Sequence, residues 1–312
     1  MRFGILGWGK IARQALAPAI AEAGHTVVAV GSREPGAAVV PEMPEVVWSD
    51  YQAVLDNPVV DAVYIALPNH LHVPWTLRAL AAGKHVLCEK PMALTLAEVD
   101  AVQAAALASG RLMREAFMVG HHPQWRWLRE QPLGPLRSMQ VAFAYDNRDA
   151  NNIRNRVEWG GGALWDIGCY AVFAGQWLMG REPDACQLQV SLHPAWGTDV
   201  HAHGSLTWGD DAVLQFQVST QAARQQAMRV VGEHGWAELA VPFNPPQETP
   251  VRRALNGGLS TGAETLVLPP VNQYAEMVKA FALAAEQDVK TDLTDSRAVA
   301  RTLVRLRVSA GL

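Results

Sequence analysis

The sequence predicts an α/β protein with two domains: a doubly wound domain over residues 1–118 and an α+β domain over residues 119–312. At roughly 150 residues per domain, a chain of 312 residues corresponds to about two domains. In the first part of the chain, short apolar runs alternate with helical segments, as in a parallel sheet with helices on both faces. Later, strand-like runs follow one another without regular helices, which indicates a large, mostly antiparallel open sheet.

The first strand–helix–strand unit is predicted at Arg2–Leu6, Lys10–Ala23 and Thr26–Val30. Apolar side chains recur every four residues in the helix, and Gly24 follows it as glycine commonly follows a helix end. Such a unit has a right-handed crossover and parallel strands. The same alternation then predicts helices over Tyr51–Asp56, Val73–Ala82 and Leu96–Ser109, and strands over Asp61–Leu67, His85–Cys88 and Leu112–Phe117.

The second domain is predicted to contain many strands and few helices. Pro, Gly and Asn are frequent over Pro242–Gly262, so this stretch is expected to be a loop. The other predicted elements are a helix over Gln124–Gln131, a strand over Arg137–Ala144, several strands between Gln187 and Val218, a hairpin and a further strand over Thr220–Pro242, and amphipathic helices over Asn272–Glu286 and Thr294–Ala310.

Composition and charge exclude several classes of protein. Hydrophobic residues make up 49% and charged residues 18%, which excludes wholesale disorder. The 26 Lys and Arg against 30 Asp and Glu give a net charge of −4, so neither nucleic acid nor a membrane surface is an expected partner. Cys88, Cys169 and Cys186 form no zinc or disulfide pattern, and no export or membrane-spanning segment is recognisable. We therefore expect a cytoplasmic location.

A glycine motif follows the first strand and opens the first helix. It reads Gly7-Trp8-Gly9-Lys10-Ile11-Ala12, a G-x-G-x-x-A pattern. The first glycine permits a tight turn, the second lets backbone N–H groups approach a pyrophosphate, and the alanine lets helix and strand pack closely. The helix N-terminus then faces the phosphates. This context predicts a dinucleotide-binding Rossmann domain.

The end of the second strand indicates which dinucleotide is bound. An NAD site usually has an acidic residue there, but this chain has Gly31 and Ser32, followed by Arg33. Ser32 can donate a hydrogen bond, and Arg33 can make a charge-assisted bond to a 2′-phosphate. Glu34 can hold NAD if the loop shifts by one residue. The sequence favours NADP(H) and leaves NAD(H) open.

Four segments together resemble the Gfo/Idh/MocA family of oxidoreductases. Besides the glycine motif, Ala66–His72 reads ALPNHLH, Gly83–Pro91 reads GKHVLCEKP, and Gly160–Tyr170 reads GGGALWDIGCY. Glu115–Met118 (EAFM) and His122–Gln124 (HPQ) further resemble the branch with dimeric dihydrodiol dehydrogenases and NADP-dependent xylose dehydrogenases. The resemblance covers most of the chain and implies the two-domain fold given above.

Lys90, Asp166 and Tyr170 are the predicted catalytic residues. Lys90 lies at the carboxyl end of a parallel strand, where open α/β sheets bind ligands, and its ammonium group can stabilise a developing alkoxide. In the resembling family the bond from this lysine to Pro91 is commonly cis. Asp166 and Tyr170 are four residues apart, which places both on one face of a helix. A nearby ammonium group lowers the pKa of a tyrosine.

Lys90 and Tyr170 are therefore predicted to form an acid/base pair, with Asp166 holding the geometry or binding substrate hydroxyls. Which of the two moves the proton stays open. The resemblance also places the turn after the third strand of the series near the nicotinamide, although His72 can instead bind backbone groups. The residues expected to bind the cofactor are Gly7, Trp8, Gly9, Lys10, Ile11, Ala12, Ser32, Arg33, Leu67, Pro68, Asn69, His72, Glu89 and Lys90.

The predicted function is hydride transfer between NAD(P) and a sugar, a polyol or a related small molecule. Two alternatives share the fold: an NAD-dependent glycosidase, and a regulator that senses a nucleotide or a sugar without catalysis. Asp146–Arg156 is either a substrate-facing loop or a solvated one, and no metal site is expected, because His121 and His122 lack a ligand spacing. The broad sheet of the second domain is expected to leave an apolar face uncovered, so we expect a homo-oligomer, most simply a dimer.

Overall fold

The computed structural model describes residues 1–33, 46–246, 248–259 and 262–312. It divides into two compact units. The first unit consists of Met1–His121 and Asn272–Arg297, and the second of His122–Val271 and Ala298–Leu312. The predicted boundary after residue 118 lies close to this division, but the prediction had assigned Asn272–Arg297 to the other domain.

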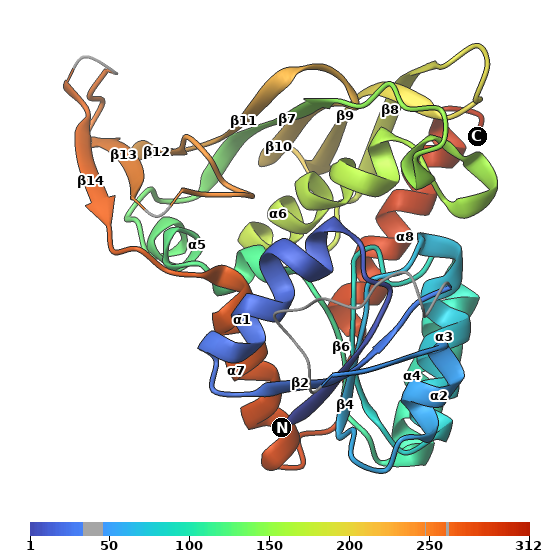
Figure 1. Cartoon of the computed structure of the whole chain (residues 1–312). Coiled ribbons are helices and arrows are strands. Elements are labelled where there is room, and N and C mark those ends of the chain that lie inside the picture. Colours follow the sequence, from blue (N-terminus) through green and yellow to red (C-terminus); the bar gives the residue numbers. More distant parts are fainter. Residues whose placement is uncertain (34–45, 247, 260–261) are drawn as a thin grey trace. The chain divides into compact units, whose positions relative to one another are not determined.

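The first unit is built on a six-stranded parallel sheet, sheet A, in the order β3-β2-β1-β4-β5-β6. The order reverses between β1 and β4, as in a doubly wound dinucleotide-binding fold. Helices lie on both faces of the sheet (Figure 1), which confirms the predicted fold class. The strands are β1 (Arg2–Leu6), β2 (Thr26–Gly31), β3 (Val47–Ser49), β4 (Ala62–Ile65), β5 (His85–Cys88) and β6 (Met113–Glu115).

The helices of this unit largely match the prediction. A helical run continues from Lys10 through one π-helical turn into α1. Helix α3 begins at Asn69 rather than Val73, with Pro68 as its N-cap. Its first turn contains the polar residues Asn69, His70 and His72, so the apolar period that predicts a helix starts only after it. The segments are η1 (Ala12–Leu16), α1 (Ala17–Glu22), α2 (Tyr51–Asp56), α3 (Asn69–Ala81), α4 (Leu96–Ser109), η3 (Met118–His121) and α7 (Gln273–Glu286).

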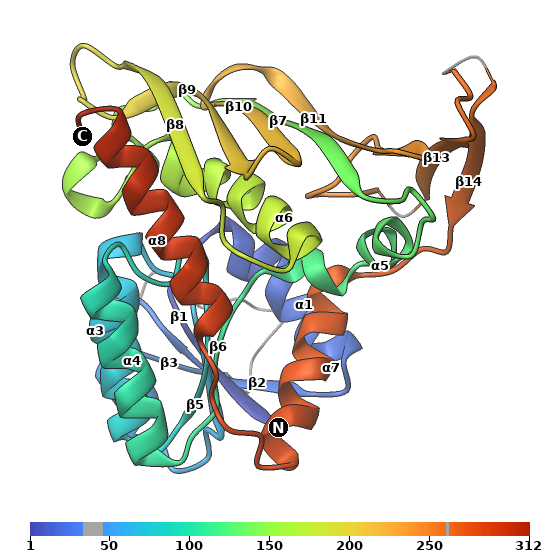
Figure 2. The same cartoon turned by 180° about the vertical axis from the view of Figure 1, so that it is seen from behind.

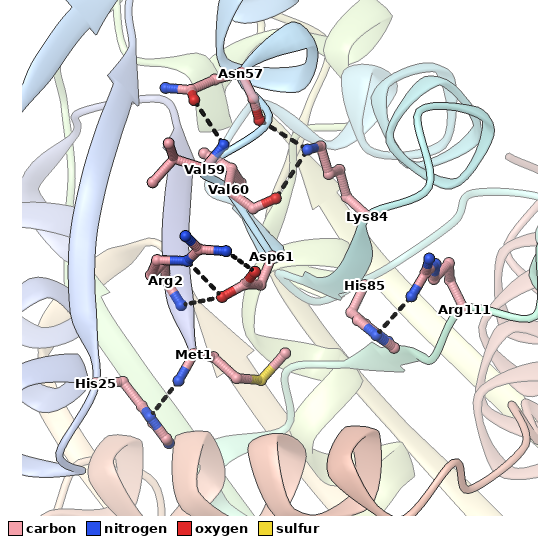
Figure 3. Close-up of polar contacts among 10 residues, drawn as sticks. All are labelled: Met1, Arg2, His25, Asn57, Val59, Val60, Asp61, Lys84, His85 and Arg111. Atoms are coloured by element: carbon pink, nitrogen blue, oxygen red, sulfur yellow. Dashed lines mark hydrogen bonds and ion pairs between the residues drawn. The ribbon is translucent and has the colours of Figure 1, made fainter.

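Polar contacts lock the amino ends of the strands of sheet A (Figure 3). The Arg2 guanidinium lies 2.7 Å from the Asp61 carboxylate, which also accepts the Arg2 backbone N–H at 2.8 Å. The Lys84 ammonium donates to the carbonyls of Asn57 and Val60, each at 2.8 Å. These bonds connect β1 to β4 and the segment before β5 to the loop before β4. The carboxyl ends of the strands carry the predicted site.

The second unit is built on an eight-stranded sheet, sheet B, in the order β14-β13-β12-β11-β7-β10-β9-β8. All its pairs are antiparallel except β10 with β7, which confirms the predicted mostly antiparallel sheet. The strands are β7 (Leu136–Asp146), β8 (Ala185–Leu192), β9 (Asp199–Trp208), β10 (Ala212–Ser219), β11 (Gln221–Gly232), β12 (Gly235–Leu239), β13 (Thr249–Leu255) and β14 (Glu264–Leu268).

The predicted loop over Pro242–Gly262 is wrong in part, since it contains β13. This strand pairs with β12 on one side and β14 on the other. Arg253 lies 2.8 Å from Glu264 of β14, and Arg252 lies 3.4 Å from Glu238 of β12. Ion pairs and backbone hydrogen bonds to the neighbouring strands thus stabilise β13, although its apolar pattern is weak.

One face of sheet B packs on helix α6 (Figure 2). The burial pattern of the strands shows that the other face is polar. Along β10, Leu214 and Phe216 are buried, whereas Gln215 and Gln217 are exposed. The expected apolar outward face is therefore wrong. The helical segments are α5 (Pro123–Arg129), η4 (Ile153–Asn155), η5 (Val157–Trp159), η6 (Leu164–Gly168), α6 (Cys169–Met179) and α8 (Thr294–Ser309), whose first residues belong to the first unit. No helix in the described ranges is long and apolar enough to cross a membrane.

Candidate active site

The glycine motif forms a tight turn at the switch point of sheet A. Gly7 has φ +93°, and its N–H donates to the Gly31 carbonyl at 3.0 Å. A Cβ atom at Gly7 would lie 2.5 Å from the Ala66 carbonyl oxygen, so only glycine fits between the ends of β1 and β4. Ala12 is fully buried. Contacts with the ends of β2 and β4, the two neighbours of β1, therefore fix this turn.

The far side of this turn suits a bound dinucleotide. A Cβ at Gly9 would meet no atom of the described residues within 4 Å, which leaves this backbone accessible to a ligand on their side. The Gly9 carbonyl accepts the first helical bond, from Arg13 at 3.1 Å, so the helix N-terminus begins here. The indole of Trp8 packs edge-on against Trp48, with ring centroids 5.3 Å apart. The buried Trp8 N–H has no acceptor among the described residues.

Ser32 and Arg33 follow the end of β2, next to the glycine turn. The Ser32 N–H donates to the Ser49 carbonyl of β3 at 3.0 Å, and Arg33 is exposed. Burial raises the pKa of Tyr51, and the positive charge of Arg33 opposes this rise. Glu34, on which the NAD alternative depends, lies outside the described residues. An exposed guanidinium here can meet a 2′-phosphate.

Glu89 and Lys90 lie at the carboxyl end of β5. The Lys90–Pro91 bond is cis, as the resemblance implies. Glu89 accepts a hydrogen bond from the Tyr64 hydroxyl at 2.5 Å, which connects it to β4. Burial strongly raises the pKa of Tyr64, so this phenol keeps its proton and stays a donor. Glu89 is thereby fixed at the end of its strand.

His72 holds the two turns on either side of Lys90. Its Nδ1 lies 2.8 Å from the Pro91 carbonyl and its Nε2 lies 2.8 Å from the Leu67 carbonyl, and the side chain is 1% exposed. Burial lowers the pKa of His72 to about 4, and a neutral ring donates to one of these carbonyls. The imidazole is engaged with backbone and covered. These contacts suit His72 to positioning the two turns, and its contact with the nucleotide stays a prediction.

Glu115, at the end of β6, entered the sequence analysis only as part of the EAFM segment and was not predicted as a site residue, but it lies beside the Lys90 turn. Its Oε1 accepts from the Met92 N–H at 2.8 Å, which anchors the chain just after Pro91. Its Oε2 is buried and makes no close hydrogen bond to any described residue, although Ser296 is near enough to favour the charged form of the carboxyl group. Burial raises the pKa of Glu115 to about 7, while the positive charge of Lys90 opposes the rise. A glutamate ending a parallel strand was the available signal, but the sequence does not say that β6 lies beside β5.

Asp166 and Tyr170 lie in the second unit, in η6 and α6 respectively. Asp166 Oδ2 accepts a short hydrogen bond from the Tyr145 hydroxyl, and Oδ1 lies 3.1 Å from Arg154 Nε. Both carboxylate oxygens thus have partners within the unit. This arrangement favours a geometric role over direct binding of substrate hydroxyls.

Tyr170 is 5% exposed and packs among aromatic rings. Its ring centroid lies 5.7 Å from that of Phe143 and 5.1 Å from that of Phe243. Phe143 and Tyr145 are two residues apart in β7 and therefore lie on the same face of that strand. Asp166 and Tyr170 consequently face the same side of β7, although the helix that carries Asp166 has a π-helical turn.

The structure gathers the predicted residues into two groups, one in each unit. In the first unit, the predicted cofactor residues follow the carboxyl ends of β1, β2, β4 and β5, which are consecutive strands of sheet A. Some of them lie in the turns and others in the helices that begin there. In the second unit, Asp166 and Tyr170 meet β7, and Arg154 brings the 146–156 loop to Asp166. Within the described ranges, no three His, Cys, Asp or Glu side chains gather in a way that would hold a metal ion.

A groove of about 780 Å³ lies on the outward face of sheet B. Glutamines line much of it, including Gln140, Gln187, Gln215 and Gln217. It contains none of the predicted catalytic or cofactor residues. A wide, polar groove on a sheet face suits contact with another protein surface better than the enclosed chemistry of a small substrate.

Comparisons with known proteins match both units. Residues 1–117 match a family described as "Oxidoreductase family, NAD-binding Rossmann fold", GFO_IDH_MocA, and residues 125–238 match the GFO/IDH/MocA C-terminal domain. A D-xylose 1-dehydrogenase (NADP(+)) of Haloferax volcanii is 32% identical, over 99% of this chain and 97% of that protein. A trans-1,2-dihydrobenzene-1,2-diol dehydrogenase of Macaca fascicularis is 29% identical, over 81% of this chain and 78% of its own.

A solved structure extends the similarity over nearly the whole chain. It is a 3-ketoreductase from Actinomadura kijaniata in complex with NADP and TDP-benzene. The match has a TM-score of 0.92 at 30% identity, and covers 99% of this chain and 98% of that one.

Proposed function

The chain belongs to the Gfo/Idh/MocA family of oxidoreductases, and from that premise we propose that it transfers a hydride between NADP(H) and a sugar, a polyol or a related carbonyl or hydroxyl compound. The observation that carries the proposal is the edge of sheet A. There the open glycine turn follows β1, the exposed Arg33 follows β2, and the Lys90 turn follows β5, within the consecutive strands β2-β1-β4-β5. The dehydrogenases of known substrate fall in the branch that the motifs indicated.

The first unit binds and orients the cofactor in this proposal. NADP(H), when bound, supplies or accepts the hydride. The N–H groups at Gly9 and the helix N-terminus hold the pyrophosphate, and Arg33 with Ser32 holds the 2′-phosphate. His72 and Glu115 keep the turns around Lys90 in place through the bonds described above. The protein's part is thus orientation and charge placement.

Lys90 and Tyr170 manage the single proton of the reaction in this proposal. The Lys90 ammonium stabilises negative charge on the reacting oxygen, and Tyr170 is the other candidate for proton transfer. Asp166, bound to Tyr145 and Arg154, maintains the segment that carries Tyr170. The retained lysine, aspartate and tyrosine favour catalysis over a sensing role.

The substrate class rests on the relatives. The Haloferax enzyme is named for D-xylose, and the Actinomadura enzyme is a 3-ketoreductase crystallised with TDP-benzene. We therefore propose a sugar or a sugar derivative for this chain. A screen of aldoses, polyols, dicarbonyls and nucleotide-linked keto sugars with NADP⁺ and NADPH, following absorbance of the reduced nicotinamide, tests this class. Absence of turnover with every compound would contradict it.

Cofactor preference is tested by calorimetric titration of NADP(H) and NAD(H). The wild-type chain is expected to bind NADP(H) more tightly. Arg33→Ala is expected to weaken NADP(H) binding by about 1.5–3 kcal/mol, the range for a hydrogen bond to a charged group, and to leave NAD(H) binding nearly unchanged. Equal or tighter binding of NAD(H) by the wild type would refute the NADP(H) preference.

We also propose that two copies associate through the outward face of sheet B. The supporting observation is the broad glutamine-rich groove, over which no helix of the described ranges lies. Sedimentation is expected to give a species of about twice the 33.9 kDa chain mass. Replacing Gln215 and Gln217 by lysine would bring like charges together at a two-fold interface and shift the mass toward the monomer. A monomeric wild type at micromolar concentration would refute the proposal.

A further inference from the structure

A buried carboxylate holds the start of the segment that carries Asp166 and Tyr170. Asp199, the first residue of β9, is 2% exposed. Its Oδ2 accepts the backbone N–H of Leu164 at 2.6 Å, and the N–H of Ala163 also favours its charged form. Leu164 is the first residue of η6. The amino end of this helical segment is thus capped by a side chain from a distant strand, with no cap from its own neighbours.

The same carboxylate lies directly against Gly162. This glycine has φ +116°, and a Cβ atom there would lie 1.9 Å from Asp199 Oδ1. The Gly162 N–H donates to the Arg154 carbonyl at 2.9 Å, and its carbonyl accepts the Asp166 N–H at 3.0 Å. Asp199 therefore contacts the residue that bonds to the backbone of both Arg154 and Asp166. These are the two partners in the ion pair of the site.

Burial and nearby hydrogen-bond donors shift the pKa of Asp199 in opposite directions. Burial raises the pKa of Asp199 to about 6, against the Leu164 and Ala163 N–H groups and the positive charge of Arg307. Arg307 belongs to α8 and lies over the Trp165 ring, 5.6 Å from its centroid. His201, two residues further along β9, bonds to the Ser219 hydroxyl of β10 at 2.8 Å. At neutral pH the carboxylate form therefore predominates.

We propose that Asp199 is a positioning residue, whose carboxylate fixes the amino end of η6 and thereby sets the directions of Asp166 and Tyr170. The proposal rests on the proposed function only where turnover is measured. A small displacement of reacting groups costs a large factor in rate, so a loosened η6 is expected to lower turnover. The phosphate-binding turn is in the other unit, so affinity for NADPH should not change.

The test compares Asp199→Asn with the wild type from pH 5 to pH 8. Asparagine resembles the protonated aspartic acid, since it carries no charge and faces the two backbone N–H groups with only one acceptor. At pH 8, kcat/KM is expected to fall about 10-fold to 100-fold in the variant, with an unchanged Kd for NADPH. Toward pH 5 the two proteins should converge, because the wild type itself becomes protonated. A ratio that stays constant over this range would overturn the proposal.

Asp184→Asn is the matched control. Asp184 also accepts a backbone N–H, that of Gly209 at 2.7 Å, and it lies in the same unit but pairs with Arg181 at the surface. This variant is expected to keep the wild-type pH profile. A control that lost the same factor at pH 8 would attribute the effect to general loosening of the unit and overturn the assignment to Asp199.

Amide hydrogen exchange on the full chain gives a readout that needs no substrate. Exchange at residues 163–166 is expected to be faster in Asp199→Asn than in the wild type or the control variant. Unchanged exchange there would overturn the proposal even if activity fell. If the wild type turns over none of the screened compounds, the proposed function fails, and exchange alone decides whether Asp199 holds this segment.

Discussion

The turn around Lys90 and the segment from Gly162 to Tyr170 are built on different principles. The Lys90 turn is the end of a parallel strand, and its supports, His72 and Glu115, come from the ends of adjacent elements of the same sheet. Burial drives both supports toward their neutral forms. The segment of the second unit instead depends on charged partners, since Asp166 faces Arg154 and Asp199 caps the helix start.

The two regions should therefore respond differently to substitutions. The supports of the Lys90 turn are driven toward neutral forms by burial, whereas the ion pair of Asp166 holds a backbone segment in position. The first region should thus be sensitive at the chemical step, and the second should be sensitive in its local folding as well. The predictions below test that contrast.

The largest effect is expected from the two proton-handling residues. Lys90→Met and Tyr170→Phe should each lower kcat by about 10²–10⁴, the usual contribution of general acid–base catalysis, with NADPH affinity nearly constant. Because both act on one proton, the double variant should lose far less than the product of the single losses. Steady-state kinetics as a function of pH measure this. Full turnover with an unchanged pH profile in Tyr170→Phe would leave Lys90 alone in this role.

A pair of glycine substitutions separates a structural glycine from a ligand-facing one. Gly162→Ala forces a Cβ into Asp199 at positive φ and should lower the free energy of unfolding by about 1–3 kcal/mol. Gly9→Ala meets no protein atom and should change stability by less than about 0.5 kcal/mol while weakening NADPH binding. Denaturant unfolding and nucleotide titration of both variants measure this. An equal loss of stability in Gly162→Ala and Gly9→Ala would contradict the distinction between a structural and a ligand-facing glycine.

The smallest effect concerns Glu115 and pH. Its pKa in the folded chain, about 7, lies above the ordinary 4.5, so the folded state favours the neutral acid. The stability that this preference contributes is present below pH 4.5 and is lost as pH rises through 7. Glu115→Gln, neutral throughout, should therefore be more stable than the wild type at pH 8, on the order of 1–3 kcal/mol, and similar at pH 4.5. A difference independent of pH would contradict the assignment.

Local signals made parts of the fold predictable to the residue. Helix α2 starts after Asp50, whose carboxylate accepts the Ala53 N–H at 2.8 Å, and α4 starts with a capping box between Thr95 and Glu98. Strand β13 was missed because its pairing with β12 and β14, rather than its own pattern, makes it a strand. Arg252 and Arg253, adjacent in the middle of β13, interrupt its apolar periodicity.

Some residues of the candidate site could likewise be predicted from the sequence, and others could not. The glycine turn and Lys90 could be predicted because strand ends in a parallel sheet bind ligands, whatever their neighbours. Glu115, Tyr145 and Asp199 could not, because each acts through a register or a strand order that only the folded sheet defines. A buried acid beside a backbone N–H leaves no pattern in the sequence.

The first unit is assembled from two separate stretches of chain, and this has a consequence for synthesis. Asn272 bonds to Glu22 at 2.7 Å, the Met113 N–H donates to the Thr291 hydroxyl at 2.8 Å, and Phe281 packs against Phe3. A nascent chain released as far as His121 lacks these partners and leaves the apolar surface under α7 uncovered. The nucleotide-binding unit is therefore completed only after residues 122–271 of the other unit have been synthesised, and Ala298–Leu312 of that other unit emerge last. An intermediate that exposes this apolar surface is prone to aggregate.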